Sequence, residues 1–382
     1  MDETRTQRYR RHDLIDWFSQ DQVAAASIAV IGAGAVGNEA VKNLSLLGVG
    51  EIDVFDFDVV ELHNLTRSVL LREADAGRNK AAAVAERARE LDPHVTVRGI
   101  AGDFWDTLSL GRLGLYDCAI AAVDNLEARL KLNQMCLIAG VDLVNVGLDS
   151  RWVTVESFPF GAAVGSACYE CTLPDTAYAR VAERYSCGGL RRRAQLERRI
   201  PTTVVTASIA GALAASTALR LGGGATPAQA RRTLIDTISG LSSVVAIDRR
   251  DGCPGCAAFP DAPRVVRTRN RWAPRSESAA DASLAELPLR LSDALITAYE
   301  CTTCGPLSDA TRYVNQRAAA FDDSIAICPT CAAPSVRVEI RDTFALGELM
   351  RRFGGSKVPV KFALAELDSG PICIDLEENP TP

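Results

Sequence analysis

The feature that most constrains the fold is a glycine-rich turn between two apolar segments near the start of the chain. A short apolar run at residues 28–31 enters the sequence GAGAVG, and a second apolar run at 52–55 follows a helical stretch. A strand, a glycine turn, a helix and a second strand in this order predict the first βαβ unit of a nucleotide-binding sheet. The same turn serves NAD, FAD and ATP, so the turn predicts a fold without specifying the nucleotide.

The three glycines of the turn have separate roles in this prediction. Gly32 allows the tight turn after the strand, and Gly34 lets the backbone approach a phosphate or a ribose. Gly37 lets the helix pack closely on the strand. By itself this turn fits an NAD-dependent oxidoreductase as well as an ATP-using enzyme.

Charged and amide side chains after the second strand favour the second of these alternatives. Asp56 and Asp58 end the strand, and Asn64, Arg67 and Lys80 come after them. A dinucleotide fold needs one acid for the ribose, whereas two cations and an amide at the carboxyl ends of parallel strands suit a triphosphate whose α-phosphate is attacked. The alternative is that these residues are ordinary surface charges on a nucleotide-fold loop.

These motifs carry a resemblance to a known family. The segment DFDVVELHNLTR, then Lys80, then Asp124 in AAVDNLEARLKLN resemble the ThiF/MoeB superfamily, which includes the ubiquitin-activating enzymes. The resemblance covers about residues 7 to 256. It implies the ATP ribose on Asp56, phosphate contacts from Asn64, Arg67 and Lys80, and Mg²⁺ on Asp124.

The segment RYRRH at residues 8–12 extends the resemblance toward the N-terminus. The family has an Arg-Tyr-Asn-Arg-Gln motif there, whose second arginine reaches into the active site of the partner subunit. The resemblance therefore implies that Arg11 acts in the partner's site and that the protein is a homodimer with shared sites. Arg10 and His12 depart from the pattern, and a solvated basic N-terminus is the alternative.

Eight of the twelve cysteines fall into four Cys-x-x-Cys pairs. In a protein expected to stay in the cytoplasm, such pairs indicate metal binding rather than disulfides, and thioredoxin-like dithiols would need a different fold context. Each pair clamps one edge of a tetrahedral Zn²⁺, so two pairs complete one structural site. The resemblance joins the first two pairs on one ion, and the 23 residues between the last two are typical of a zinc ribbon. The predicted sites are Cys168, Cys171, Cys253 and Cys256, and Cys301, Cys304, Cys328 and Cys331.

Cys187 differs from the other unpaired cysteines in its surroundings. It lies in YSCGGLRRR, a glycine-containing segment beside cations, whereas Cys118, Cys136 and Cys373 lie in apolar runs. Neighbouring cations lower the pKa of a thiol and favour the nucleophilic thiolate. In the family the crossover loop carries the cysteine that takes the acyl group as a thioester, often followed by Thr where this chain has Gly188. The resemblance implies a catalytic Cys187, and an incidental loop thiol is the alternative.

Charge and composition exclude several classes of protein. The net charge of −6 argues against a nucleic-acid surface. The N-terminus is polar and charged, so we expect neither a signal peptide nor a membrane anchor. The uncharged run at 200–219 is rich in Thr, Ser, Ala and Gly, which predicts a buried, closely packed helix rather than a membrane span. We expect a cytoplasmic protein that acts on a small molecule or another protein.

The predicted fold class is α/β: a doubly wound, Rossmann-like, mostly parallel sheet with an antiparallel extension, plus a small C-terminal α+β module that contains a zinc ribbon. Residues 1–261 would form the adenylation domain, 262–290 a linker rich in Arg, Pro, Ser and Ala, and 291–382 the module. Within the module we expect a strand over 335–340, a helix over 343–353 and two short strands.

The resemblance implies ATP-dependent adenylation of the C-terminal carboxylate of a ubiquitin-like, β-grasp protein with a Gly-Gly-type tail. Thioester transfer to Cys187 and hand-over to a conjugating enzyme would follow. The alternative within the family is activation of a sulfur-carrier protein for molybdopterin, thiamine or tRNA thiolation, and a peptide-modifying adenylyltransferase is a further one. An NAD-dependent oxidoreductase and a non-catalytic zinc scaffold are the alternatives from other classes.

Overall fold

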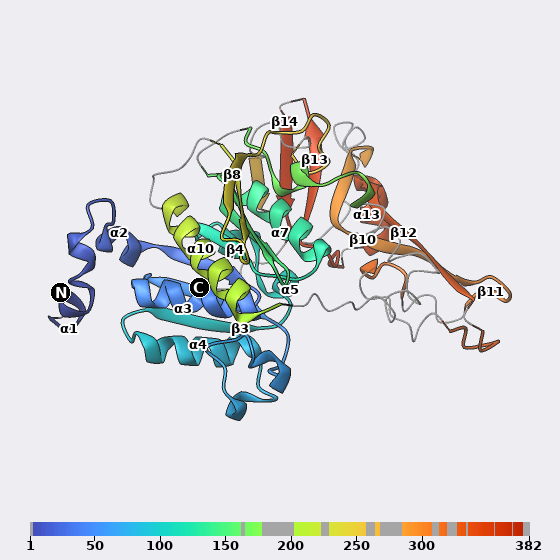
Figure 1. Cartoon of the computed structure of the whole chain (residues 1–382). Helices are drawn as coiled ribbons and strands as arrows, with labels where there is room; N and C mark the ends of the chain where they lie inside the picture. Colours follow the sequence, from blue (N-terminus) through green and yellow to red (C-terminus); the bar gives the residue numbers. More distant parts are fainter. Residues whose placement is uncertain are drawn as a thin grey trace. The chain divides into compact units, whose positions relative to one another are not determined.

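The computed structural model describes residues 3–161, 165–177, 202–222, 229–256, 264–267, 285–307, 313–318, 327–333, 335–354, 356–368 and 370–376. The chain divides into two compact units. The first comprises Met1–Leu173 and Arg199–Ala262, and the second comprises Pro174–Arg198 and Pro263–Pro382. Each unit is built around its own sheet, so the two are described separately (Figure 1).

The first unit contains an eight-stranded sheet in the order β3-β2-β1-β4-β5-β6-β7-β8. The first five strands in this order pair in parallel, and the last three extend the sheet by antiparallel pairing. This is the mostly parallel sheet with an antiparallel extension that the sequence predicts. The bounds are β1 Ser27–Ile31, β2 Glu51–Asp56, β3 Thr96–Ala101, β4 Cys118–Ala121, β5 Asp142–Leu148, β6 Trp152–Phe158, β7 Arg231–Asp236 and β8 Ser242–Ala246.

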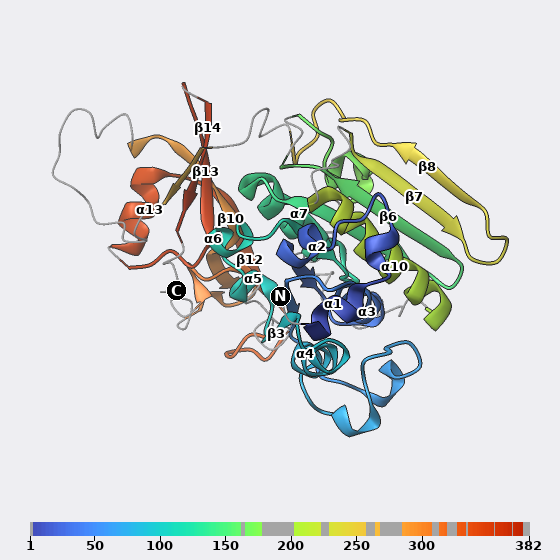
Figure 2. The ribbon, with the colours of Figure 1, turned by 90° about the vertical axis from the view of Figure 1, so that its left-hand side faces the viewer.

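Helices α3 (Ala35–Leu47), α4 (Lys80–Leu91) and α10 (Val204–Gly222) pack together on one face of this sheet (Figures 1 and 2). The connection from β4 to β5 runs the opposite way along the sheet, so its helix α7 (Leu126–Ala139) covers the other face, as right-handed crossovers require. The shorter helices are α1 Glu3–Tyr9, η1 His12–Leu14, α2 Gln20–Ala25, η2 Leu62–Asn64, η3 Glu73–Asp75, α5 Phe104–Thr107, α6 Leu110–Leu113 and η4 Tyr169–Thr172.

The sequence explains where the main helices begin and end. Asn79 and Asn125 are the N-caps of α4 and α7, and each side chain accepts a hydrogen bond from a backbone N–H in the first turn. Gly48 and Gly140 end α3 and α7 in the left-handed conformation that glycine adopts without strain. Helix α4 therefore begins at Lys80 directly after its cap, and α7 runs from Leu126 to Ala139 between its two caps.

The core of the first unit consists of aliphatic strand residues facing small helix residues. Val30, Ile52 and Ile120 are buried in the sheet, and alanines of α4 and α10 pack against it. Among the described helices, α10 is long and apolar enough to cross a membrane by length and composition. It nevertheless packs on α3 and on β4, β5 and β6, in agreement with the predicted buried helix. A Cβ on its Gly211 would lie 2.4 Å from the Cβ of Glu39, so the two helices approach closely at this point.

The second unit contains a six-stranded sheet with its own core of Leu289, Leu295, Phe344 and Leu349. Its strands pair antiparallel except for β14 with β9, and helix α13 (Leu346–Phe353) connects β12 to β13. The bounds are β9 Arg264–Arg267, β10 Pro288–Cys301, β11 Gly305–Pro306, β12 Val336–Ala345, β13 Phe362–Leu367 and β14 Gly370–Asp375.

Two features of the second unit differ from the sequence expectation. The helix predicted from residue 343 is wrong at its start, because Thr343 and Phe344 still pair with β10 and the helix begins at Leu346. The stretch 262–290, expected as a linker, contains β9, which pairs with β14, and the first residues of β10. Strand pairing with residues about a hundred positions away supplies order that the local composition does not indicate.

Candidate functional site

The glycine turn lies at the carboxyl end of β1, between β2 and β4. Gly32 has a φ of +101°, and a Cβ there would lie 2.5 Å from the carbonyl oxygen of Ala122. A Cβ on Gly37 would lie 1.8 Å from the carbonyl oxygen of Gly32, so helix α3 presses directly on the turn. At Gly34 no heavy atom of the described residues lies within 4 Å of such a Cβ. Two glycines are thus required by packing, and Gly34 faces open space.

Asp56 ends β2 and holds the turn from the other side. Its carboxylate accepts hydrogen bonds from the backbone N–H of Ala33 at 2.7 Å and of Asp58 at 2.8 Å. Burial raises the pKa of Asp56 above its ordinary value, and the two backbone hydrogen bonds oppose that shift. The result is a partly desolvated carboxylate beside the glycine turn, a good acceptor for a ligand hydroxyl.

Lys80 and Asp58 form an ion pair at the N-terminus of α4. The Lys80 Nζ lies 2.8 Å from Asp58 Oδ2, and the Lys80 backbone N–H donates to the Asp58 carbonyl. Asn79 donates to the carbonyl oxygens of Asp56 and Asp58, which fixes the start of the helix against β2. Because the Asp58 side chain is 51% exposed, the ion pair is weak and the ammonium can exchange it for a phosphate.

The loop between β2 and α4 carries Asn64 and Arg67. Asn64 is buried, and its Oδ1 accepts a hydrogen bond from the Glu61 N–H, so the side chain organises the loop from within. Arg67 is half-buried and donates from Nη1 to the His63 carbonyl oxygen at 2.9 Å. The phosphate contacts expected from these two residues stay predictions.

Asp124 follows β4, the strand that pairs with β1, and its side chain is exposed just before α7. The structure therefore places Asp124 and Asp56 at the ends of β4 and β2, on either side of β1. Carboxylates at the carboxyl ends of adjacent parallel strands are where such sheets bind ligands. An exposed carboxylate oxygen also fits Mg²⁺, which is commonly held by one or two carboxylates together with substrate phosphates.

A polar network beside Asp124 is absent from the sequence prediction. Arg129, on α7, donates to the Val123 carbonyl oxygen and to Asn145, and burial lowers the pKa of Arg129. Asn145 donates to Glu156 at 2.6 Å, and Glu156 pairs with Arg232 at 2.6 Å. The sequence contains one signal of this network, an arginine one turn into the helix after Asp124. The other members lie on β5, β6 and β7, so the fold alone brings them to the arginine.

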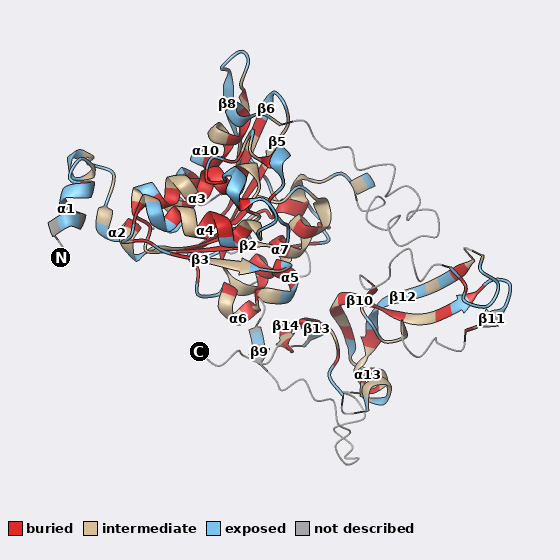
Figure 3. Cartoon of the chain, turned by 90° about the horizontal axis from the view of Figure 1, so that it is seen from below, coloured by how far each residue is buried: buried red, intermediate tan, exposed pale blue. Residues whose placement is uncertain are grey.

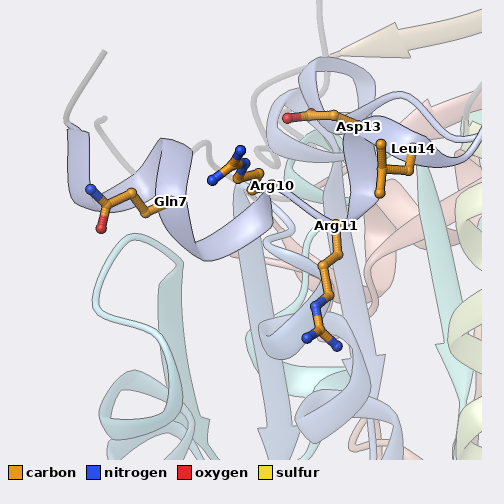
Figure 4. Close-up of a pocket in the computed structure, with 5 residues that line it drawn as sticks. All are labelled: Gln7, Arg10, Arg11, Asp13 and Leu14. Atoms are coloured by element: carbon orange, nitrogen blue, oxygen red, sulfur yellow. The ribbon is translucent and has the colours of Figure 1, made fainter.

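The N-terminal segment is anchored to the first unit by Tyr9. Its ring lies against Gly48, and its hydroxyl donates to the Asp92 carboxylate. Arg10 and Arg11 line an open pocket with Gln7, Asp13 and Leu14, and the two guanidinium groups point in different directions (Figure 4). Within the described part of the chain, the side chain of Arg11 has neither a hydrogen-bond nor an ion-pair partner, although its backbone carbonyl accepts from the Leu14 N–H. Its guanidinium is therefore available to a ligand or to another subunit.

The first predicted set of four cysteines comes together in the first unit. The Sγ atoms of Cys168 and Cys253 are 3.7 Å apart, those of Cys171 and Cys256 are 3.5 Å apart, and all four lie within 4.8 Å of one another. A tetrahedral Zn²⁺ with Zn–S bonds of 2.3 Å separates its sulfurs by about 3.8 Å. Hydrogen bonding within the cluster raises the pKa of Cys168 and lowers that of Cys171. Because cysteine binds a metal as the thiolate, a bound cation would replace the thiol protons.

The second set comes together at the end of the β10–β12 ribbon in the second unit. Its sulfurs also lie within 4.8 Å of one another, with 3.8 Å between Cys301 and Cys331 and 4.0 Å between Cys304 and Cys328. Cys301 and Cys328 are buried over a small cluster with Tyr299 and Leu307. Cys304 and Cys331 are exposed, which makes this set more open to solvent than the first.

Three of the unpaired cysteines are unsuited to nucleophilic chemistry. Cys118, Cys136 and Cys373 are buried, and burial raises the pKa of each, to about 12 for Cys373. A buried thiol with a raised pKa is a poor nucleophile at neutral pH. Cys187 lies outside the residues that the structure describes, so its predicted role stays a prediction.

Comparison with known proteins places these features in a family. The model of the ThiF family matches residues 7–255. The adenylyltransferase and sulfurtransferase MOCS3 of Sus scrofa is 29% identical over 252 residues, which cover 66% of this chain and 52% of that protein. The SAMP-activating enzyme E1 of Haloferax volcanii is 31% identical over 178 residues, which cover 46% of this chain and 64% of that protein. The chain spans about half the length of the MOCS3 relatives that it matches.

Solved structures agree on the fold. The crystal structure of E. coli MccB superposes with a TM-score of 0.53 at 22% identity, covering 65% of this chain and 72% of that chain. PaaA superposes with a TM-score of 0.51 at 19% identity, covering 65% of this chain and 84% of that chain. At these identities the likeness shows the fold alone. The resemblance predicted from the motifs between Arg11 and Asp124 is confirmed by a family model that spans well over half of the chain, and the protein belongs to the ThiF family.

Proposed function

We propose that this protein is an adenylyltransferase that uses ATP to activate the C-terminal carboxylate of a ubiquitin-like, β-grasp protein. The observation that carries the proposal is the arrangement at the ends of β1, β2 and β4. An open glycine, a partly buried acid and an exchangeable lysine lie at one edge of the sheet in a ThiF-family chain. Relatives named as ubiquitin-like modifier-activating and SAMP-activating enzymes support a protein substrate.

In the proposed reaction the ATP ribose binds Asp56, and the phosphates pass Gly34 to reach Lys80 and Arg67. The substrate carboxylate attacks the α-phosphate, the bond from the α-phosphate to the bridging oxygen breaks, and pyrophosphate leaves with its electron pair. Fixed cations stabilise the charge that develops on the phosphates during this step. Mg²⁺ held by Asp124 would add charge neutralisation at the same oxygens. The product is an acyl adenylate.

If the Cys187 thiolate then attacks the acyl carbon, a thioester forms and AMP leaves. A thioester product implies a conjugating enzyme as the next acceptor. The relatives named adenylyltransferase and sulfurtransferase support the second candidate, a sulfur-carrier protein, equally well. A peptide-modifying adenylyltransferase is a third candidate, and MccB shares only the fold with this chain. The proposal also includes a cytoplasmic location, an adenylation domain at 1–261 and a C-terminal module.

We propose a homodimer, and the β7–β8 hairpin supports it. Ile238, Leu241, Val244 and Val245 are 75%, 73%, 62% and 50% exposed, and every residue of β8 is exposed, as the burial colours of the ribbon in Figure 3 indicate. Strand β8 ends the sheet, and residues 238–246 contain no charged residue and no proline. Natural edge strands usually carry such residues to prevent pairing, so an uncharged apolar edge suits a subunit contact.

We propose structural Zn²⁺ in both cysteine clusters, because the sulfur distances fit and four cysteine ligands complete a tetrahedral site without an open position for substrate. The test of the main proposal is isotope exchange between pyrophosphate and ATP. Exchange that depends on a carrier protein with a Gly-Gly tail is expected, and an oxidoreductase or a scaffold gives none. Exchange with a short peptide but with no carrier protein would instead support the peptide-modifying reading.

The shared-site prediction has a separate test. Arg11→Ala and Asp124→Ala should each abolish exchange, since a preorganised cation at a transferring phosphate is worth on the order of 10³ in rate. If each site takes Arg11 from one chain and Asp124 from the other, mixing the two variants restores one intact site per heterodimer. Heterodimers verified by two different affinity tags that remain inactive would show that Arg11 does not act across the interface.

A further inference from the structure

The helix after the glycine turn carries a buried amide that the proposed mechanism does not use. Asn38 follows Gly37 directly and is fully buried. Its Nδ2 donates to the carbonyl oxygen of Ala33 at 3.0 Å, and its Oδ1 accepts from the backbone N–H of Leu70 at 2.7 Å. One side chain therefore joins the turn to the loop between β2 and α4.

Each of the two ends is part of the candidate site. The Ala33 N–H donates to Asp56 at 2.7 Å, so the peptide groups on both sides of Ala33 are fixed, one by Asp56 and one by Asn38. Leu70 is buried and lies three residues after Arg67, on the loop that is also organised by Asn64. The amide thus sets the distance between the turn, where the phosphates would pass, and the segment that carries Arg67.

From this geometry we propose that Asn38 is a positioning residue for Arg67, and that it fixes the loop cation relative to the glycine turn. This inference rests on the proposed function. Apolar burial of Leu70 and Leu71 holds the loop against the core, but apolar contacts have no direction. A pair of hydrogen bonds from one rigid amide is satisfied in a single placement of the two segments, because the donor and the acceptor of an amide are distinct. A misplacement of about 1 Å in such a site costs roughly a hundredfold in rate.

The test is a double-mutant cycle between Asn38→Ala and Arg67→Ala, read out on ATP affinity by calorimetry and on the rate of pyrophosphate exchange. In an otherwise wild-type background we expect Asn38→Ala to slow exchange by roughly ten- to a hundredfold. In the Arg67→Ala background the same change should cost less than about threefold, because the cation that it positions is gone. Equal losses in both backgrounds would overturn the inference in favour of a general packing role.

Asn43→Ala is the matched control, since Asn43 lies on the same helix and, among the residues that the structure describes, its side-chain amide donates to the Glu39 carbonyl oxygen one turn away and to no other group. We expect Asn43→Ala to leave the rate of pyrophosphate exchange within about threefold of wild type. Its effect should also be additive with that of Arg67→Ala. If the Asn43 variant couples to Arg67 as strongly as the Asn38 variant does, the effect is not specific to the amide at position 38, and the inference fails.

Hydrogen exchange of the Leu70 amide keeps the inference testable if Asn38→Ala folds poorly. Asn38→Asp retains the acceptor for the Leu70 N–H but loses the donor to Ala33, so it should keep Leu70 protected while weakening ATP binding. Fast exchange at Leu70 in the wild-type protein would overturn the inference. The ATP affinities of the four proteins in the cycle could show the expected coupling while wild type shows no pyrophosphate exchange. In that case the proposed function fails and the role of Asn38 stands. If wild type catalyses pyrophosphate exchange but the effects of Asn38→Ala and Arg67→Ala are additive, the proposed function stands and the role of Asn38 fails.

Discussion

Replacing Gly37 by alanine is the sharpest test of how the turn is built. The added Cβ would lie 1.8 Å from the Gly32 carbonyl oxygen, whereas real Cβ atoms essentially never come closer than 3.0 Å to a neighbouring heavy atom. The helix or the turn must therefore move by more than 1 Å. Overpacking of this kind costs about 1–3 kcal/mol. For a unit of 150–250 residues each kcal/mol lowers Tm by roughly 2–4 °C, so we expect a loss of about 2–12 °C.

Gly34→Ala is the matched control on the same turn, because a Cβ at Gly34 meets no described heavy atom within 4 Å. Gly34 is the N-cap of α3, so its replacement by alanine should lower the free energy of unfolding by about 1 kcal/mol. Alanine also reduces the entropy of the unfolded chain, which raises the free energy of unfolding by about 0.4–1 kcal/mol. The stability of the ligand-free protein should therefore hardly change. If the nucleotide phosphates occupy that space, ATP affinity should fall roughly tenfold or more, equivalent to about 1.4 kcal/mol.

The assay is scanning calorimetry of the two ligand-free variants, followed by titration of each with ATP. The reasoning requires the two effects to separate: Gly37→Ala loses stability, and Gly34→Ala loses affinity at unchanged stability. A Gly37→Ala protein with the same Tm as wild type would refute the close approach of helix α3 and the glycine turn. A Gly34→Ala protein that binds ATP normally would refute the placement of the phosphates.

The remaining predictions concern metal, covalent chemistry and pH. Protein purified without chelator should contain two Zn²⁺ per chain, and a metal analysis below about one would contradict both cysteine sites. Cys187→Ala should keep pyrophosphate exchange and lose a thiol-sensitive adduct with the carrier; wild type that adenylates without any adduct would favour the sulfur-carrier alternative. Hydrogen bonds from Arg151 lower the pKa of Asp236 below its ordinary value of 3.8. The pair therefore contributes its full stabilisation of the fold above pH 3.8, and this contribution decreases as the pH falls below 3.8. The stability difference between wild type and Arg151→Met, followed by urea unfolding, should therefore shrink on acidification, and a difference that is constant from pH 6 to 3 would disprove the linkage.

Local signals were sufficient for the nucleotide-binding half of the fold. The βαβ unit is visible in the sequence because apolar runs, glycines and the acidic residues at 56 and 58 are adjacent in the chain. The start of α4 is visible for the same reason, since Asn79 is a strong N-cap just before an alanine-rich run. Each of these features depends on interactions within a few residues, which is what propensity and periodicity report.

Features set by distant partners were missed. Asn38 and Leu70 are 32 residues apart, and nothing near either one indicates the hydrogen bond between them. The role of Arg129 is equally hidden in the sequence, because the network that it joins continues through Asn145 on β5 to residues on β6 and β7. In the second unit, Leu289, Leu291 and Leu295 alternate as a strand requires, but the register of β10 against β12 is interrupted between residues 290 and 295. Such an irregularity is decided by packing on the partner strands rather than by the local sequence.

The first cysteine cluster is connected to the candidate site through α7. Asn133 is fully buried on this helix; it accepts a hydrogen bond from the Tyr169 N–H at 2.9 Å and donates to Glu170 at 3.3 Å, both within the Cys168–Cys171 turn. The same helix begins at Leu126, two residues after Asp124. A Cβ on Gly255 would lie 2.5 Å from the Glu170 carboxylate, so the second cysteine pair closes tightly over the same residue. The zinc that we propose for this cluster would therefore hold the middle of a helix whose N-cap, Asn125, directly follows the proposed Mg²⁺ ligand. Its contribution to catalysis would be the placement of Asp124, although no cysteine of the cluster takes part in the chemistry.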